Sequence, residues 1–128
     1  MAPFSKYIAV SSLAWLTVFP VHAQELRQVA VQNLGSSIAY LAICESKNFS
    51  EKENYLASKI LLSASKTLSS EGYSKLRAQY QTSLHEKLHY SISKNRWFPF
   101  RIDKKHCSEI ENAAPMLLQH LSAIREMQ

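Results

Sequence analysis

The sequence contains little glycine and little proline. Beyond residue 23 the two glycines are Gly35 and Gly72, and the two prolines are Pro99 and Pro115. An all-β domain needs a turn roughly every 8–12 residues, and turns favour these residue types, so their scarcity argues against that class. Internal repeats and low-complexity segments are also missing, which excludes collagen-like chains. A chain of 128 residues has room for one compact domain.

The chain also lacks an apolar run long enough to cross a bilayer, which takes about 20 residues. The one extended run, Tyr7–Phe19, follows the basic residue Lys6 and is ended by a proline. Val21 and Ala23 then place small residues at the −3 and −1 positions of a cleavage site. This order is typical of a secretory signal peptide. We therefore predict that residues 1–23 are a cleaved signal peptide rather than a retained anchor.

Cysteine is scarce too, since Cys44 and Cys107 are the only two. Export would place both in a compartment where disulfides persist, and two cysteines allow one intramolecular pairing. Redox-active pairs usually lie close together as C-x-x-C, whereas these two are 63 positions apart. We therefore predict a structural disulfide, which would stabilise the fold by about 4 kcal/mol on the loop-entropy model.

Apolar residues recur every three or four positions in four stretches, which is the helical period. These stretches are Leu26–Cys44, Leu56–Leu68, Tyr73–Ile92 and Ile110–Ile124. Four helices joined by short loops, with no strand pattern between them, predict an all-α, four-helix bundle-like domain over residues 24–128. The disulfide would tie the end of the first helix to the start of the fourth.

The sequence allows two starts for the fourth helix. Ser108 and Glu111 form a capping-box pattern, but Pro115 would then lie inside the helix and kink it. If Asn112 is the cap instead, Pro115 falls in the first turn and costs little.

Gly35-Ser36-Ser37 interrupts the first apolar stretch. Glycine inside a helix costs about 1 kcal/mol relative to alanine. We interpret this tripeptide as a site of close contact with a neighbouring helix, with a hinge as the alternative.

His85-Glu86-Lys87-Leu88-His89 resembles the H-E-x-x-H motif of zincin metallopeptidases. On a helix, residues four apart share one face, so two imidazoles can bind one Zn²⁺. The resemblance implies that His85 and His89 are ligands and that Glu86 is the general base toward the metal-bound water. Glu109, 20 residues beyond His89, matches the downstream glutamate of the gluzincin branch. Other candidates for a third ligand are His106, Glu111 and His120.

Other features of the chain favour a structural role for this pentapeptide. Lys87 places a charge where zincins usually carry an uncharged residue, and no predicted strand precedes His85. Leu84 and Leu88 occupy the core stripe, so both histidines lie at its border and Glu86 lies toward solvent. We therefore expect no cofactor, with a passive zinc site and a minimal zinc peptidase as alternatives.

Positive charge is in modest excess, with 15 Lys and Arg against 10 Asp and Glu. The basic residues are spread over all predicted helices, with small clusters at Lys75-Arg77 and Arg101-Lys104-Lys105. Nucleic-acid modules carry a dense basic stripe, so we expect no nucleic-acid partner. Contact with an anionic membrane surface or cell-wall polymer stays an alternative.

The segment 95–101 combines arginine with aromatic residues, a combination that is enriched at interface hot spots. Packing at the open end of the bundle is the simplest role for three large apolar groups. One loop cannot easily turn all three inward, so we expect one or two in an exposed patch rimmed by arginine. The predicted binding residues are Arg96, Trp97, Phe98, Phe100 and Arg101.

These patterns together predict an exported, soluble, non-catalytic binding protein of chaperone, adaptor or inhibitor type, located in the periplasm or the extracellular medium. Its expected partner is another exported or envelope protein. Self-association is a further expectation, because it would bury leftover apolar side chains such as Leu61 and Leu118. The alternative from the enzyme class is the minimal zinc metallopeptidase.

Overall fold

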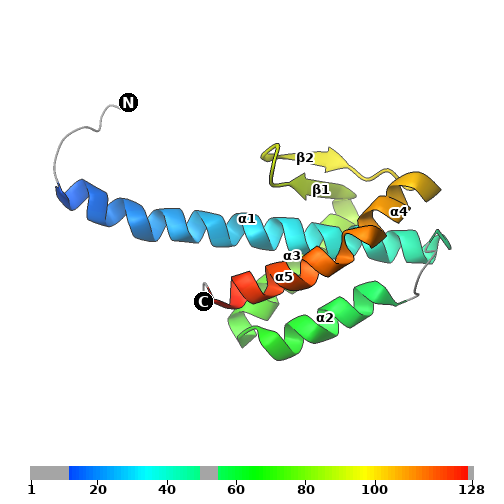
Figure 1. Cartoon of the computed structure of the whole chain (residues 1–128), viewed down its shortest axis with the longest axis horizontal. Coiled ribbons are helices and arrows are strands. Elements are labelled where there is room, and N and C mark those ends of the chain that lie inside the picture. Colours follow the sequence, from blue (N-terminus) through cyan, green and yellow to red (C-terminus); the bar gives the residue numbers. More distant parts are fainter. Residues whose placement is uncertain (1–11, 50–54, 127–128) are drawn as a thin grey trace.

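The computed structural model describes residues 12–49 and 55–126, with backbone alone for 12–25. Residues 1–11 of the predicted signal peptide therefore lie outside the described residues. The elements in chain order are α1 (Ser12–Ser46), α2 (Leu56–Thr67), α3 (Ser70–Glu86), β1 (Leu88–Ser91), β2 (Arg96–Pro99), α4 (Lys104–Asn112) and α5 (Ala114–Glu126) (Figure 1). The predicted small helical domain is confirmed. In the described part of the chain, no helix is both long enough and apolar enough to span a membrane.

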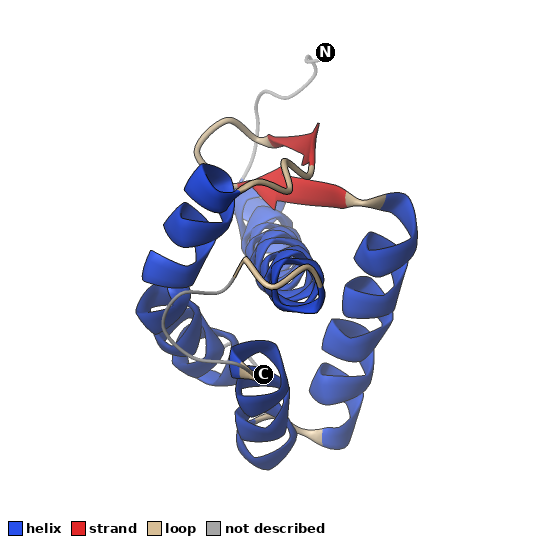
Figure 2. Ribbon diagram, turned by 90° about the vertical axis from the view of Figure 1, so that its right-hand side faces the viewer, coloured by secondary structure: helices blue, strands red, loops and turns tan. Residues whose placement is uncertain are grey.

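Helix α1 is the centre of the domain. Seen end-on, the other helices and the hairpin surround it (Figure 2), and it packs against each of the other helices and against β1. Every residue from Leu34 to Leu41 is buried, as expected for a helix that is covered on all sides. The surrounding helices each contribute one apolar face, including Ala57, Ile60, Ala64, Leu76, Leu117, Leu121 and Ile124.

Helices α1 and α3 approach each other closely at Gly35. A Cβ atom placed on this glycine would lie 2.8 Å from both Cβ and Cγ of Gln79 and 3.2 Å from the backbone nitrogen of Tyr80. Side chains essentially never tolerate such distances, so only glycine fits without a shift of α3. The interpretation of Gly35 as a close helix contact is confirmed.

The prediction that the third helix continues to Ile92 is wrong. Lys87 adopts a left-handed conformation with a φ of 59° and ends α3. The chain then forms an antiparallel hairpin, in which Tyr90 lies opposite Trp97 and Ser91 opposite Arg96. Ile92, assigned to the apolar stripe, is 45% exposed in the turn.

The C-terminal region forms two helices rather than one. Helix α4 begins at Lys104, and the Asp103 carboxylate caps it by accepting the N–H of His106 at 2.8 Å. Neither of the two candidate caps, Ser108 and Asn112, immediately precedes a helix start, because both lie inside α4. Helix α5 begins at Ala114, so Pro115 is its second residue, where the missing N–H has no helical partner to lose.

The predicted Cys44–Cys107 disulfide is confirmed. Its Cα atoms are 5.7 Å apart, and it joins the end of α1 to α4. A second link organises the same end of the domain, since the Glu45 carboxylate accepts the N–H groups of Leu56 and Ala57 at 2.7 and 3.2 Å. This carboxylate satisfies free donors at the N-terminus of α2 and complements its helix dipole.

Candidate binding surface

The structure divides the H-E-x-x-H pentapeptide between two elements. His85 and Glu86 are exposed at the end of α3, whereas His89 lies in β1. The shared face that would direct two imidazoles at one ion exists only on a continuous helix, and α3 ends before His89. The predicted helical arrangement of this motif is therefore wrong.

His89 is engaged with α1. Its Nε2 atom lies 3.0 Å from the Ser37 hydroxyl, and its ring meets the Tyr40 ring edge-on with centroids 5.6 Å apart. Burial lowers the pKa of His89 below its ordinary value of 6.5, because the charged ring would lose its hydration. The neutral imidazole thus packs as part of the contact between α1 and the hairpin.

The residues named as zinc ligands do not converge. Glu109 lies exposed on α4, on a different element from both His85 and His89. Among the described residues no three His, Cys, Asp or Glu side chains are grouped so that they could hold a metal ion. A catalytic zinc needs three protein ligands, and no such group is found among the described residues around Glu86.

The predicted binding residues Arg96, Trp97 and Phe98 lie in β2. The Arg96 guanidinium lies over the Phe98 ring, 4.6 Å from its centroid, and the Lys94 ammonium is 5.4 Å from the same centroid. On the other face of the strand, Trp97 packs edge-on against Tyr90 at 5.0 Å. The structure therefore gathers two cations around one half-buried aromatic ring.

The hairpin contacts α1 through the edge of β1 that faces away from β2. The Tyr90 N–H donates to the Ser36 hydroxyl at 3.0 Å, and the Asn33 amide donates to the Tyr90 carbonyl at 2.9 Å. Both backbone groups of Tyr90 therefore point toward the helix. Strand β2 lies on the far side of β1 from α1 (Figure 1).

Phe100 and Arg101 continue from β2 into a loop that α1 holds in place. Phe100 stacks on Tyr40 with centroids 4.5 Å apart, so it anchors the loop. The Tyr40 hydroxyl donates to the Arg101 carbonyl at 2.8 Å and accepts the Arg101 N–H at 3.0 Å. These contacts fix the backbone of Arg101 while its side chain stays exposed.

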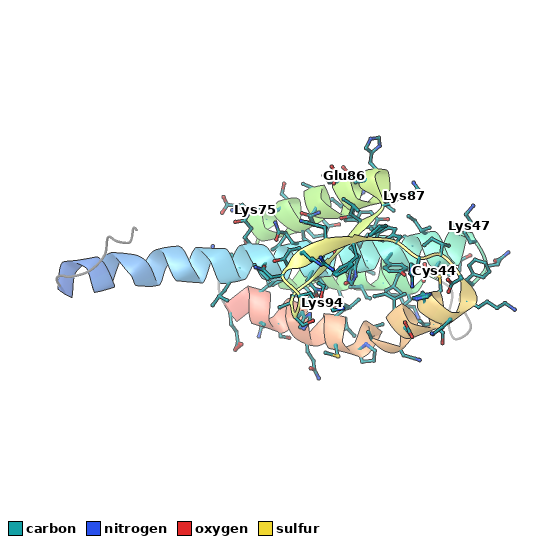
Figure 3. All side chains as sticks on the ribbon, turned by 90° about the horizontal axis from the view of Figure 1, so that it is seen from above. Cys44, Lys47, Lys75, Glu86, Lys87 and Lys94 are labelled. Carbon is teal, nitrogen blue, oxygen red and sulfur yellow. A yellow bond between two sulfur atoms is a disulfide. The ribbon has the colours of Figure 1, made fainter. Side chains whose placement is uncertain are left out.

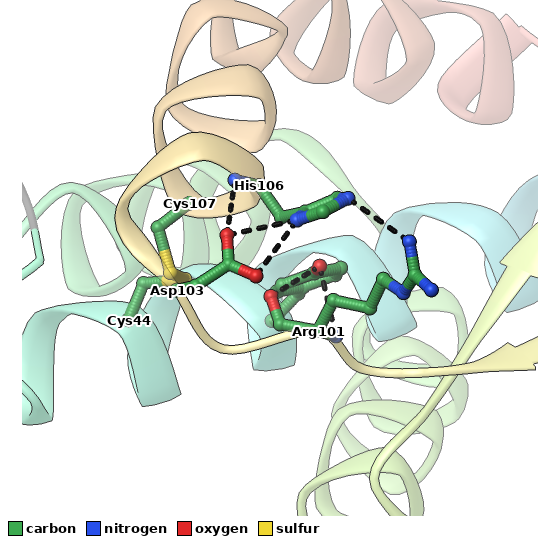
Figure 4. Close-up of polar contacts among 6 residues, drawn as sticks. Cys44, Arg101, Asp103, His106 and Cys107 are labelled. Atoms are coloured by element: carbon green, nitrogen blue, oxygen red, sulfur yellow. Dashed lines mark hydrogen bonds and ion pairs between the residues drawn. A yellow bond between two sulfur atoms is a disulfide. The ribbon is translucent and has the colours of Figure 1, made fainter.

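A short polar chain orients the Arg101 side chain beside the disulfide (Figure 4). The Asp103 carboxylate lies 2.8 Å from His106 Nδ1, and His106 Nε2 lies 3.4 Å from the Arg101 guanidinium. Hydrogen bonds from His106 lower the pKa of Asp103. When Nδ1 donates to the carboxylate, the neutral ring has Nε2 free to accept from arginine.

The segment from the end of α3 to the first turn of α4 carries the whole excess of positive charge. Residues 87–105 contain six of the 15 basic residues and one of the 10 acidic residues, so the remaining nine of each sign cancel. All six basic side chains are exposed, and Lys87 and Lys94 lie at opposite ends of the hairpin (Figure 3). The six are Lys87, Lys94, Arg96, Arg101, Lys104 and Lys105.

Sequence reasoning missed the contribution of the lysines and the edge-on hairpin. Summing charge over a moving window would have located the lysines. The alternation of Leu88–Ser91, followed by four turn residues and a second short aromatic segment, was the signal for the hairpin. The apolar residues that precede this segment recur at helical spacing, so the segment was assigned to the third predicted helix instead.

A groove of about 570 Å³ lies between α1 and α3. Its lining residues are Arg27, Gln28, Val31, Gln32, Lys75, Ala78, Gln79 and Thr82. This set contains no carboxylate, imidazole or thiol, so the groove does not bring together an acid and a base.

Comparison with known protein families, with curated proteins and with solved structures finds no match to this chain.

Proposed function

We propose that this chain is an exported, non-catalytic binding protein that contacts an acidic surface of another exported or envelope protein. The contact is made by Lys94, Arg96, Phe98 and Arg101, which we call the basic hairpin surface. The observation that carries this proposal is that the entire excess positive charge lies in residues 87–105, on exposed side chains of the hairpin, its flanking loop and the first turn of α4. Clustered charge of this kind selects partners of opposite sign and accelerates association.

The basic hairpin surface is also preorganised. The Phe98 ring lies under the Arg96 guanidinium, and Tyr40 holds the backbone of Arg101. Side chains that are already ordered lose less entropy on binding. Arginine on an aromatic ring keeps its planar donors available for carboxylates, which suits an acidic protein partner.

Two features support export. The N-terminal part of α1 extends past the other elements in Figure 1, and the core residues of α1 that the structure describes begin at Ala30. Cleavage after Ala23 would leave all of these core residues in the product. The disulfide supports the same location, because such bonds persist outside the cytosol.

Charge reversal tests the proposed surface. An acidic oligoglutamate peptide is the probe, and the test variant is Arg96→Glu/Arg101→Glu. Its matched control is Lys75→Glu/Arg77→Glu, which changes the net charge equally at exposed positions of α3. We expect the hairpin variant to lose at least about tenfold in affinity and the α3 variant to lose much less. Equal losses would contradict the proposal, because binding would then follow net charge alone.

A further inference from the structure

The outer edge of β2 is open for another strand. In an antiparallel ladder, residue pairs alternate between those that exchange backbone hydrogen bonds and those that do not. Tyr90 directs its N–H and C=O to Ser36 and Asn33, so its pair with Trp97 is of the second kind. The N–H and C=O of Trp97 therefore point away from β1, toward the outer edge.

Two further observations agree with an open edge. Among the described elements, only β1 packs extensively against β2. Pro99, two residues after Trp97, occupies the position whose N–H would also point outward, and proline in sheets is confined to such edges. The edge thus offers one complete donor and acceptor pair at Trp97 and one further carbonyl at Pro99.

The side chains on the two faces of β2 specify the chemistry of an added strand. A residue placed opposite Trp97 would lie on the face of Trp97, and its two neighbours would lie on the face of Arg96 and Phe98. The first face is aromatic, and the second carries the Arg96 and Lys94 cations. The matching segment has an apolar residue flanked by acidic ones.

We infer that the partner docks an extended acidic segment as an additional antiparallel strand on the outer edge of β2, with its apolar residue opposite Trp97 and its acidic residues beside Arg96. This inference rests on the proposed function, because it specifies how the basic hairpin surface holds its acidic partner. Backbone hydrogen bonds supply affinity in this mode of recognition, and the alternate side chains supply specificity.

The test uses short acetylated peptides with an Asp-Val-Asp centre and the ¹⁵N-labelled, oxidised chain. The unmodified peptide is compared with one that is N-methylated at the central valine, which keeps the charge but cannot donate a hydrogen bond to Trp97. We expect the methylated peptide to bind at least tenfold more weakly. The Trp97 amide should exchange rapidly in the free protein and become protected in the complex, whereas the amides of Arg96 and Phe98 are protected in both states.

The outcomes separate this inference from the proposed function. Equal binding of both peptides, lost in Arg96→Glu, would overturn strand addition and keep the charged surface. Binding that survives Arg96→Glu would overturn both. No binding of either peptide overturns strand addition, and binding of phosphatidylglycerol vesicles under those conditions would assign the surface to an anionic bilayer instead.

Discussion

Polar side chains on buried turns of α1 hold the hairpin in position. Ser36 and Ser37 are almost completely buried, yet each contacts a polar group of β1. Buried polar groups cost little when they are paired and much when one partner is lost. Single residues of α1 therefore control where the basic hairpin surface sits.

Ser36→Ala should destabilise the protein by about 1–3 kcal/mol, because the buried N–H of Tyr90 would lose its acceptor. Urea denaturation measures the effect. Ser58→Ala, at an exposed position of α2, is the control and should change stability little. Equal unfolding midpoints for the two variants would show that the Ser36 contact does not anchor the hairpin.

His89 should make stability depend on pH in weak acid. Its pKa is lower in the folded state than its ordinary value of 6.5, so between these two values the unfolded chain binds more protons. Stability therefore rises with pH through that window and falls as the pH drops below about 6.5. The denaturant midpoint of the wild type should change with pH across this range, and this pH dependence should be weaker in His89→Gln. His85→Gln, at an exposed position, should keep the wild-type slope, and a flattened slope there would contradict the assignment.

At the scale of elements, the close contact between α1 and α3 fixes the distance between these two helices. The contact depends on the missing side chain of Gly35. Helix α3 leads directly into the hairpin through Lys87, so a shift of α3 would carry the hairpin with it.

Gly35→Ala should destabilise the protein even though alanine is the better helix former. Overpacking costs about 1–3 kcal/mol, which exceeds the gain of about 1 kcal/mol in helix propensity. Thermal unfolding measures the net loss. Adding Gln79→Ala removes the Cγ atom at 2.8 Å and should recover part of it. A Gly35→Ala protein that is more stable than the wild type would show that the two helices can separate freely.

At the scale of the whole molecule, the disulfide closes a loop that contains most of the domain. The two cysteines are 63 positions apart, and both are buried. The crosslink restricts the unfolded chain, and it also fixes α4 beside the loop that carries Arg101.

Cys44→Ala/Cys107→Ala should lower the free energy of unfolding by about 4 kcal/mol on the loop-entropy model. Denaturation with and without reductant measures this loss. The reductant should destabilise the wild type and leave the double variant unchanged. A Cys44–Cys107 peptide should also be found by mass spectrometry under non-reducing conditions, and two alkylatable thiols in the folded protein would contradict the crosslink.

Much of the helical framework could be predicted because a helix forms its backbone hydrogen bonds within its own segment of the chain. The apolar spacing of Leu56–Leu68 and Ile110–Ile124 marks faces that the structure buries in one core. Cys44 and Cys107 had one possible pairing, so their disulfide could be predicted from the expected export and from their wide spacing. The segment around Arg96 also stood out locally, by residue type.

The placement of the hairpin against α1, the separate helix α5 and the open edge at Trp97 could not be read from local pattern. A strand needs hydrogen-bond partners from outside itself, and β1 takes them from Asn33 and Ser36, more than 50 positions away. The sequence alone therefore determined the helical class, the crosslink and the segment rich in arginine and aromatics. Tertiary structure decided that His89 turns toward α1 and that the outer edge of β2 is open. Both features depend on which groups of α1, distant in sequence, lie beside the hairpin.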